Sequence, residues 1–211
     1  MRITLPKIYA ITDTRISGIS HGEQVARLIA GGFTLIQLRD KEASPRAFYE
    51  SAKAAVSIAR KHGTTIIIND HVDIALAIGA DGVHLGQNDL PPEHARSLLG
   101  PQAIIGYSTH SLEQACFALR YPIDYLAIGP VFRTGTKENP DPIVGIETVK
   151  AIRHEVGQMP LVAIGGINFD NLRGVLKAGA DSAAIIGGLI SDGNAITKTA
   201  EKLIFQADRE D

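Results

Sequence analysis

The chain has 211 residues, 45% of them hydrophobic and 21% charged, which is ordinary for a globular protein able to bury a sizeable core. Its net charge of −2 excludes a global basic field, so we expect neither a nucleic-acid nor a membrane partner. The single cysteine, Cys116, cannot form an intrachain disulfide, and no apolar leader or membrane-length run is present. We therefore expect a cytoplasmic protein.

Short apolar runs alternate with segments of helical periodicity along the whole chain. The runs predict strands at 8–11, 33–38, 65–68, 82–85, 104–107, 125–128, 161–164 and 183–186. Helix starts are indicated by Ser20 with Glu23, by Ser44 before Pro45, by Ser111 with Gln114, and by Asn168. The amphipathic pattern places Leu76 and Leu98 on the buried faces of their helices.

The predicted strands are continuously apolar, which is typical of parallel strands buried on both faces. Eight strand and helix units predict an α/β fold, a single (β/α)8 TIM barrel over residues 1–211, with a doubly wound open sheet as the alternative. Gly-Ala-Asp precedes both the fourth and the eighth strand, at 79–81 and 179–181. This echo fits two four-unit halves, or only a favourable turn from helix to strand.

Two carboxylates follow neighbouring predicted strands, Asp70 after the third and Asp89 after the fourth. The carboxyl ends of parallel strands meet at one face, where barrels place their active sites. Two acidic groups plus a substrate phosphate are a usual Mg²⁺ arrangement. The alternative is that both are turn residues or helix caps, Asp70 being followed directly by a helix.

Other strand ends carry groups suited to phosphate oxygens. Gly165-Gly166 and Gly187-Gly188 follow the seventh and eighth strands, whose loops commonly form the phosphate site of such barrels. Cationic and hydroxyl donors come from the second strand end and from the long loop 129–144, and they are Arg39, Lys41, Thr134, Thr136 and Lys137. Arg39 and Lys41 alone also fit a solvated surface pair.

The histidines indicate no nucleophile set and no metal cluster. His84 lies within a strand and is expected to be a packed interior residue. His110 follows a strand end, and the sequence leaves open whether it contacts a ligand. The remaining five are expected at the surface, namely His21, His62, His71, His94 and His154. The residues taken together predict a Mg²⁺-dependent enzyme with two anion sites and two phosphorylated substrates.

Several motifs, in this order and over nearly the full length, resemble those of the thiamine phosphate synthase family. They are Tyr9-Ala10-Ile11-Thr12-Asp13, Gln37-Leu38-Arg39-Asp40-Lys41, Ile68-Asn69-Asp70, Gly82 to Asp89, Gly106 to His110, Gly129-Pro130-Val131-Phe132 with Thr134 to Lys137, and Ala163 to Ile167. Any one of these alone is weak, but their order is specific. One departure is Arg133, where the family usually has proline, so contacts of that loop are the least certain part of the resemblance.

The resemblance implies a transferase that joins hydroxymethylpyrimidine diphosphate to thiazole phosphate, giving thiamine phosphate and diphosphate. It implies Asp70 and Asp89 as Mg²⁺ ligands. It places Arg39, Lys41, Asn69, Ser108 and Lys137 around the diphosphate and pyrimidine, with Gln37 on the pyrimidine, and it assigns catalysis to Lys137, Arg39 and Ser108. It assigns the thiazole phosphate to Thr134, Thr136, Gly166, Ile186 and Gly187.

Two other functions stay open at this point. A related barrel, thiazole tautomerase, shares a Ser-x-His such as Ser108-Thr109-His110, but it is expected to lack the aspartate pair and the Thr-x-Thr-Lys loop. A non-catalytic phosphate-binding protein would not need groups that stabilise a leaving diphosphate. The sequence leaves open whether the chain forms a homo-oligomer.

Overall fold

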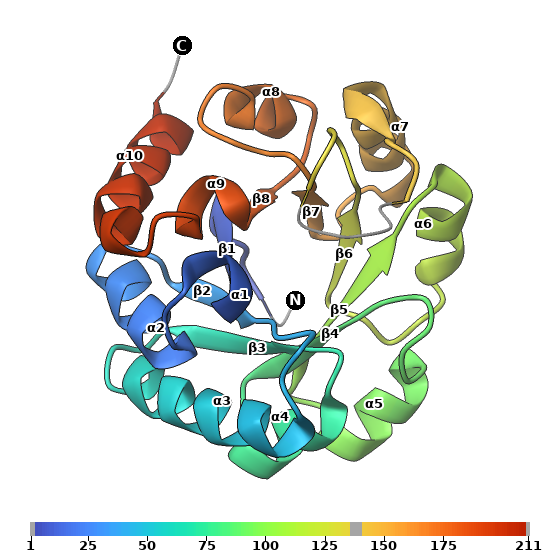
Figure 1. The fold of residues 1–211 in the computed structure, drawn as a ribbon. Coiled ribbons are helices and arrows are strands. Elements are labelled where there is room, and N and C mark those ends of the chain that lie inside the picture. The colour runs from blue at the N-terminus through green and yellow to red at the C-terminus, as the bar shows by residue number, and fades with distance from the viewer. Residues whose placement is uncertain (1–2, 136–140, 210–211) are drawn as a thin grey trace.

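The computed structural model describes residues 3–135 and 141–209, and within them eight parallel strands close into a barrel (Figure 1). The strands follow one another around the barrel in chain order, and β1 pairs with both β2 and β8. The predicted barrel is therefore confirmed. An open doubly wound sheet is excluded, because every strand has two hydrogen-bonded neighbours.

The strands match the predicted runs, with ends shifted by one or two residues. They are β1 Ile8–Thr12, β2 Leu35–Leu38, β3 Thr65–Asn69, β4 Gly82–Leu85, β5 Ile104–Thr109, β6 Tyr125–Ile128, β7 Leu161–Ile164 and β8 Ser182–Ile185. The pairing of β3 with β4 includes Asn69, and the pairing of β5 with β6 includes Ser108. Both of these side chains are therefore placed by strand register and not by a loop.

Helices surround the barrel and cover the outer face of the sheet (Figure 1). The described helices are α1 Thr14–Ser17, α2 His21–Ala30, α3 Pro45–Arg60, α4 Val72–Ile78, α5 Pro92–Leu99, α6 Leu112–Ala118, α7 Gly145–Val156, α8 Leu172–Lys177, α9 Gly187–Ile190 and α10 Ile196–Asp208, with a 3₁₀ turn at Gly193–Ala195. The short helices α1 and α9 lie inside the ring formed by the others (Figure 1). The short helices α1 and α9 were not predicted, because four residues are too few to show a periodic pattern. Among the described helices, none is long and apolar enough to cross a membrane.

Side-chain caps begin several helices as the sequence indicates. Ser20, Ser44 and Ser111 each accept a hydrogen bond from the backbone amide three residues later. The prediction for Asn168 is wrong, because α8 begins after Asn171, and Asn168 instead accepts from the amide of Asp170 in the preceding turn. The asparagine closes a local turn before the helix starts.

Two apolar layers make the core. The larger lies between the strands and the helices, and the smaller fills the barrel and includes Tyr9, Ile67 and Tyr125. Leu76 and Leu98, predicted to be buried, are 53% and 56% exposed. Their helices are short and bury only the stripe that contacts the sheet, so the edge of the predicted apolar face lies in solvent.

A repeated carboxylate contact joins pairs of neighbouring strands at the end of the barrel where the strands begin. Three aspartates, Asp81, Asp124 and Asp181, each directly precede a strand. Each carboxylate accepts a hydrogen bond from a backbone amide at the start of the strand before it, at 2.7 to 2.8 Å. Arg96 and Arg153 pair with the second and third of these carboxylates. The Gly-Ala-Asp echo is explained by this helix-to-strand turn, since Asp124 follows Pro-Ile in the same role.

Candidate active site

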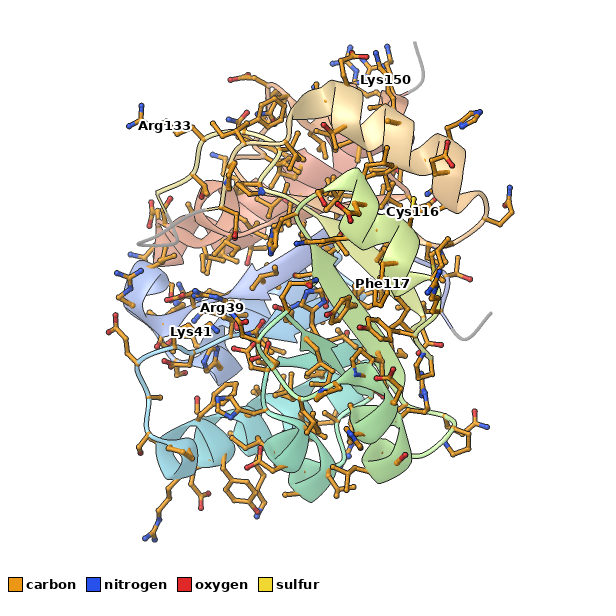
Figure 2. The ribbon with its side chains drawn as sticks, turned by 90° about the vertical axis from the view of Figure 1, so that its right-hand side faces the viewer. Arg39, Lys41, Cys116, Phe117, Arg133 and Lys150 are labelled. Carbon is orange, nitrogen blue, oxygen red and sulfur yellow. The ribbon has the colours of Figure 1, made fainter. Side chains whose placement is uncertain are left out.

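A cavity of about 850 Å³ opens at the carboxyl ends of the strands. Every predicted site residue that the structure describes lines it, namely Gln37, Arg39, Lys41, Asn69, Asp70, Asp89, Ser108, Thr134, Gly166, Ile186 and Gly187. Thr136 and Lys137 lie outside the described residues. Figure 2 shows Arg39, Lys41 and Arg133 at this end of the barrel, with Cys116 and Phe117 on α6 away from it.

The acidic side of the cavity is formed by Asp70 and Asp89. Lys41 forms an ion pair with Asp70, and the amide of Gly86 donates to Asp89 at 2.7 Å. Burial raises the pKa of Asp89, and the neighbouring Asp70 carboxylate raises it further because two like charges oppose each other's ionisation. A cation bound between the two carboxylates would relieve this repulsion.

Asp70 has an unusual backbone. Its φ of 62° lies in the left-handed region, and the amide of His71 bonds to the carbonyl of Asn69 at 2.7 Å, so Asp70 is the centre of a three-residue turn. It does not cap α4, whose N-cap is His71 without a side-chain bond. Strained residues of this kind concentrate at functional sites. Of the two alternatives for Asp70, the helix cap is therefore wrong, whereas the position in a turn is observed.

The donor set fits Mg²⁺. Carboxylate oxygens are the ligands this ion prefers, and it commonly binds one or two of them and takes its other ligands from water and substrate phosphate. Within the described ranges no three His, Cys, Asp or Glu side chains gather as a metal cluster. Asp70 and Asp89 would thus hold the ion only together with water and a phosphorylated ligand.

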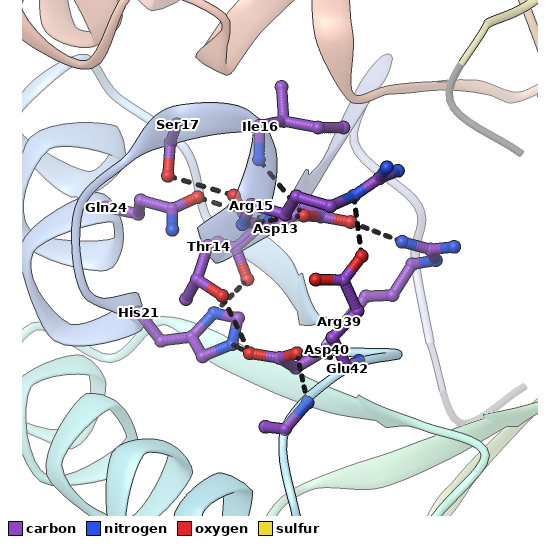
Figure 3. A network of polar contacts seen from close by, with 12 residues as sticks. Asp13, Thr14, Arg15, Ile16, Ser17, His21, Gln24, Arg39, Asp40 and Glu42 are labelled. Carbon is purple, nitrogen blue, oxygen red and sulfur yellow. Dashed lines mark hydrogen bonds and ion pairs between the residues drawn. The ribbon is translucent and has the colours of Figure 1, made fainter.

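Arg39 is held toward the cavity by Asp13, which lies in one of the family motifs but was assigned no role from the sequence. One carboxylate oxygen of Asp13 pairs with Arg39, and the other caps α1 by accepting from the amides of Arg15 and Ile16 at 3.0 and 3.2 Å (Figure 3). Asp13 is only 4% exposed. A buried carboxylate with charge-assisted bonds on both oxygens gives Arg39 a defined position.

The substitution Asp13→Asn is expected to lower kcat/KM about tenfold, the scale of one lost charge-assisted hydrogen bond. Asparagine still caps α1, so the midpoint of thermal unfolding should change little. Steady-state kinetics and thermal denaturation check this together. Unchanged kinetics would mean that Asp13 does not position Arg39 for the reaction.

His21, which was predicted at the surface, is buried close to Asp13 and Arg39. Its side chain is fully buried, with Nδ1 2.7 Å from the Thr12 hydroxyl and Nε2 3.5 Å from Asp40 (Figure 3). Burial lowers the pKa of His21. The prediction failed because the first residue of α2 is covered by β1, by the segment after β2 and by Phe48 of α3, none of which is local in sequence.

The opposite side of the cavity is built from glycines. Gly166 has a φ of 64°, and a Cβ there would lie 2.5 Å from the carbonyl oxygen of Arg133. Only glycine therefore allows β7 and the loop after β6 to approach this closely. Ile186 and Gly187 begin α9, where backbone amides have no partner within the helix. This side can offer backbone donors to an anion.

A chain of hydrogen bonds crosses the barrel along the cavity wall, and four of its five residues line the cavity. Gln37 Nε2 donates to the Tyr9 hydroxyl at 3.0 Å, which contacts the Tyr125 hydroxyl at 3.0 Å. Tyr125 contacts His84 Nδ1 at 2.9 Å, and His84 Nε2 lies 2.8 Å from Ser108 Oγ. The prediction that His84 is an interior residue is confirmed, but its link to two site residues was missed.

Burial lowers the pKa of His84 to about 4, well below its ordinary value of 6.5. The unfolded chain therefore binds more protons than the folded one between these values, and the free energy of unfolding should fall as pH falls from about 6.5 toward 4. His21 acts in the same direction. Denaturant unfolding across this range should show a smaller pH dependence for His84→Gln than for the parent. An identical slope would show that His84 does not contribute.

His110 also lies at the cavity wall. Its Nδ1 bonds to the carbonyl of Gly129 at 2.6 Å and is 3.6 Å from Asp141, on the far side of the long loop. The histidine thus joins the end of β5 to both ends of that loop.

Comparisons with known proteins agree with this geometry. The sequence model described as thiamine monophosphate synthase matches residues 8–189. The chain is 44% identical over 197 residues to a thiamine-phosphate synthase of Koribacter versatilis, covering 90% of this chain and 92% of the relative. It is 46% identical over 184 residues to that of Syntrophomonas wolfei, covering 87% and 88%. The chain belongs to the thiamine monophosphate synthase family.

A solved structure of the family has the same fold. Thiamine phosphate pyrophosphorylase from Pyrococcus furiosus superposes with a TM-score of 0.85 at 39% identity, covering 96% of this chain and 95% of that one. Membership in the thiamine monophosphate synthase family makes this chain a transferase whose activity is thiamine phosphate synthesis.

Proposed function

We propose that the chain couples hydroxymethylpyrimidine diphosphate with thiazole phosphate in a Mg²⁺-dependent reaction, giving thiamine phosphate and diphosphate. The observation that carries this proposal is the division of one cavity into two anion-binding sides. One side has Asp70, Asp89, Arg39 and Lys41, and the other has the glycine-built backbone. The diphosphate is assigned to the first side and the thiazole phosphate to the second.

The chemistry asks mainly for charge stabilisation and alignment. The bond from the pyrimidine methylene carbon to the diphosphate oxygen breaks, and the diphosphate leaves with the electron pair. The amino group of the pyrimidine donates electrons to the resulting cation. The thiazole nitrogen then forms the new carbon–nitrogen bond with its lone pair. This bond formation removes no proton, so no general base is required.

Each site residue that the structure describes has a role that its position supports, and Thr136 and Lys137 are given theirs from the sequence alone. Arg39, Lys41 and Ser108 are assigned as donors to the departing diphosphate, and Lys137 is given the same task from the sequence alone. Asn69 and Gln37 bind the pyrimidine, and Thr134, Thr136, Gly166, Ile186 and Gly187 bind the thiazole phosphate. Asp70 and Asp89 would hold Mg²⁺, which when bound supplies further neutralisation of diphosphate charge.

The catalytic unit is proposed to be a single domain over residues 1–211, acting on small molecules. Purified protein, both substrates and either Mg²⁺ or EDTA test the reaction directly. Thiamine phosphate formed only with Mg²⁺ is the expected result. Isomerisation of the thiazole phosphate without coupling would favour a tautomerase, and ligand affinity without any turnover would favour a binding protein.

A further inference from the structure

Counting hydrogens leaves two consistent directions for the hydrogen-bond chain along the cavity wall, and the position of Gln37 Nε2 against the Tyr9 hydroxyl selects one of them. Among the described residues, the Tyr9 hydroxyl bonds to Gln37 and Tyr125. Gln37 Nε2 already donates to the Tyr9 oxygen, so the single Tyr9 hydrogen must be donated to Tyr125. Tyr9 is one of the cavity-lining residues but is only 1% exposed, and among the described residues Tyr125 is the partner that remains for this hydrogen. A buried hydroxyl hydrogen without an acceptor would be costly.

The same count of hydrogens can be continued from Tyr125 to Ser108. Tyr125 accepts from Tyr9 and must donate its own hydrogen to His84 Nδ1. Nδ1 is then an acceptor, so the imidazole carries its hydrogen on Nε2 and donates it to Ser108 Oγ. The hydroxyl hydrogen of Ser108 is thereby left for a ligand in the cavity.

We propose that one directed hydrogen-bond relay couples ligand recognition at Gln37 to hydrogen donation by Ser108. The relay runs from Gln37 through Tyr9, Tyr125 and His84 to Ser108. With its nitrogen on Tyr9, Gln37 offers its carbonyl oxygen to the ligand, an acceptor for an amino group. Ser108 offers a donor, suited to a diphosphate oxygen. If Gln37 turned its oxygen toward Tyr9, every hydrogen bond of the relay would reverse and Ser108 would no longer have a free hydrogen to donate. Tyr9, Tyr125 and His84 are therefore positioning residues for Gln37 and Ser108.

The barrel interior is shaped to fit this relay. A Cβ at Gly106 would lie 2.0 Å from Cζ and 2.3 Å from the hydroxyl of Tyr125, so β5 has a glycine where the tyrosine crosses the barrel. The His84 and Tyr125 rings are nearly parallel, with centroids 5.5 Å apart. Tyr9 and Tyr125 meet edge to face at 6.0 Å. These contacts fix the rings, and the rings fix where the hydroxyl groups lie.

The assignment of an amino group and a diphosphate to the two ends rests on the proposed function, but the direction of the relay does not. Long-range ¹H–¹⁵N NMR of protein labelled with ¹⁵N-histidine reports which imidazole nitrogen carries the hydrogen. We expect the His84 signals, identified by their loss in His84→Gln, to show the Nε2–H form. The Nδ1–H form would overturn the proposed direction.

A double-mutant cycle tests the coupling. Tyr125→Phe and Ser108→Ala are each expected to lower kcat about tenfold, the scale of one hydrogen bond. The double variant should be no slower than Ser108→Ala, because the relay acts through that hydroxyl. Multiplicative losses would overturn the relay, since they indicate independent effects. Tyr107→Phe is the matched control, a buried tyrosine on β5 outside the cavity lining and the relay, and its kcat should stay at the parent value.

Failure of the proposed function and failure of the relay give different results. A parent protein that makes no thiamine phosphate would overturn the proposed function, and the NMR result would still decide the relay's direction. A parent that turns over and shows multiplicative losses would overturn the coupling alone. Thermal unfolding of each variant separates loss of fold from loss of the relay.

Discussion

Asp89→Asn is expected to lower Mg²⁺-dependent thiamine phosphate formation about a thousandfold while the barrel stays folded. This is the upper end of the loss seen when one group that stabilises transition-state charge is removed. The asparagine oxygen can still accept the Gly86 amide, so the local turn should persist. What disappears is the negative charge that, with Asp70, makes this side of the cavity suited to a divalent cation.

Measuring the initial rate at increasing Mg²⁺ concentration shows whether Asp89 acts as a metal ligand. If Asp89 is a ligand, the variant should need more Mg²⁺ for half-maximal rate, and its rate should stay low at saturation. Asp73→Asn is the matched control, because Asp73 lies on the neighbouring helix α4 with a side chain 79% exposed. Full turnover by Asp89→Asn, or loss of its cooperative unfolding, would remove Asp89 from the proposed metal site.

Gly106→Ala is expected to lower the free energy of unfolding by about 3 kcal/mol or more, the upper range for overpacking a filled core. The added methyl group would lie 2.0 Å from Tyr125 Cζ, a ring held by Tyr9 and His84. Denaturant unfolding measures the effect. Gly22→Ala is the control, since its Cβ would meet only Ile58 at 3.4 Å, and it should be neutral or stabilising.

A second substitution distinguishes packing from the relay. In Gly106→Ala/Tyr125→Leu the ring is gone, so the overpacking is relieved, but the Tyr9 hydroxyl and His84 Nδ1 lose their partner, and we expect only part of the lost stability to return. Turnover should not return, because the hydroxyl that joins Tyr9 to His84 is absent. Recovery of both would show that Tyr125 only fills space.

The barrel and the location of the site were predictable, because both depend on patterns local to each strand. A continuous apolar run followed by a polar residue predicts a buried parallel strand and a side chain at its carboxyl end. Asp70, Asp89 and Arg39 were predicted in this way, and all three line the cavity. Their common placement follows from the parallel arrangement, which brings all strand ends to one face.

The interior relay was not predictable, because it depends on contacts across the barrel. Tyr9 and Tyr125 lie in apolar runs and read as ordinary strand residues, and β1 and β6 are not neighbours in the sheet. Only closure of the barrel brings their hydroxyls to 3.0 Å. Two signals were present in the sequence, namely a tyrosine in an otherwise aliphatic run and a glycine inside β5.

The carboxylate contacts of Asp81, Asp124 and Asp181 have a consequence for how this protein can change. They tie strand beginnings to one another at the end of the barrel far from the cavity, using helix arginines and backbone amides. Stability and chemistry are therefore supplied by opposite ends of the same strands. We therefore expect a change in the loops at the cavity end to leave these carboxylate contacts in place.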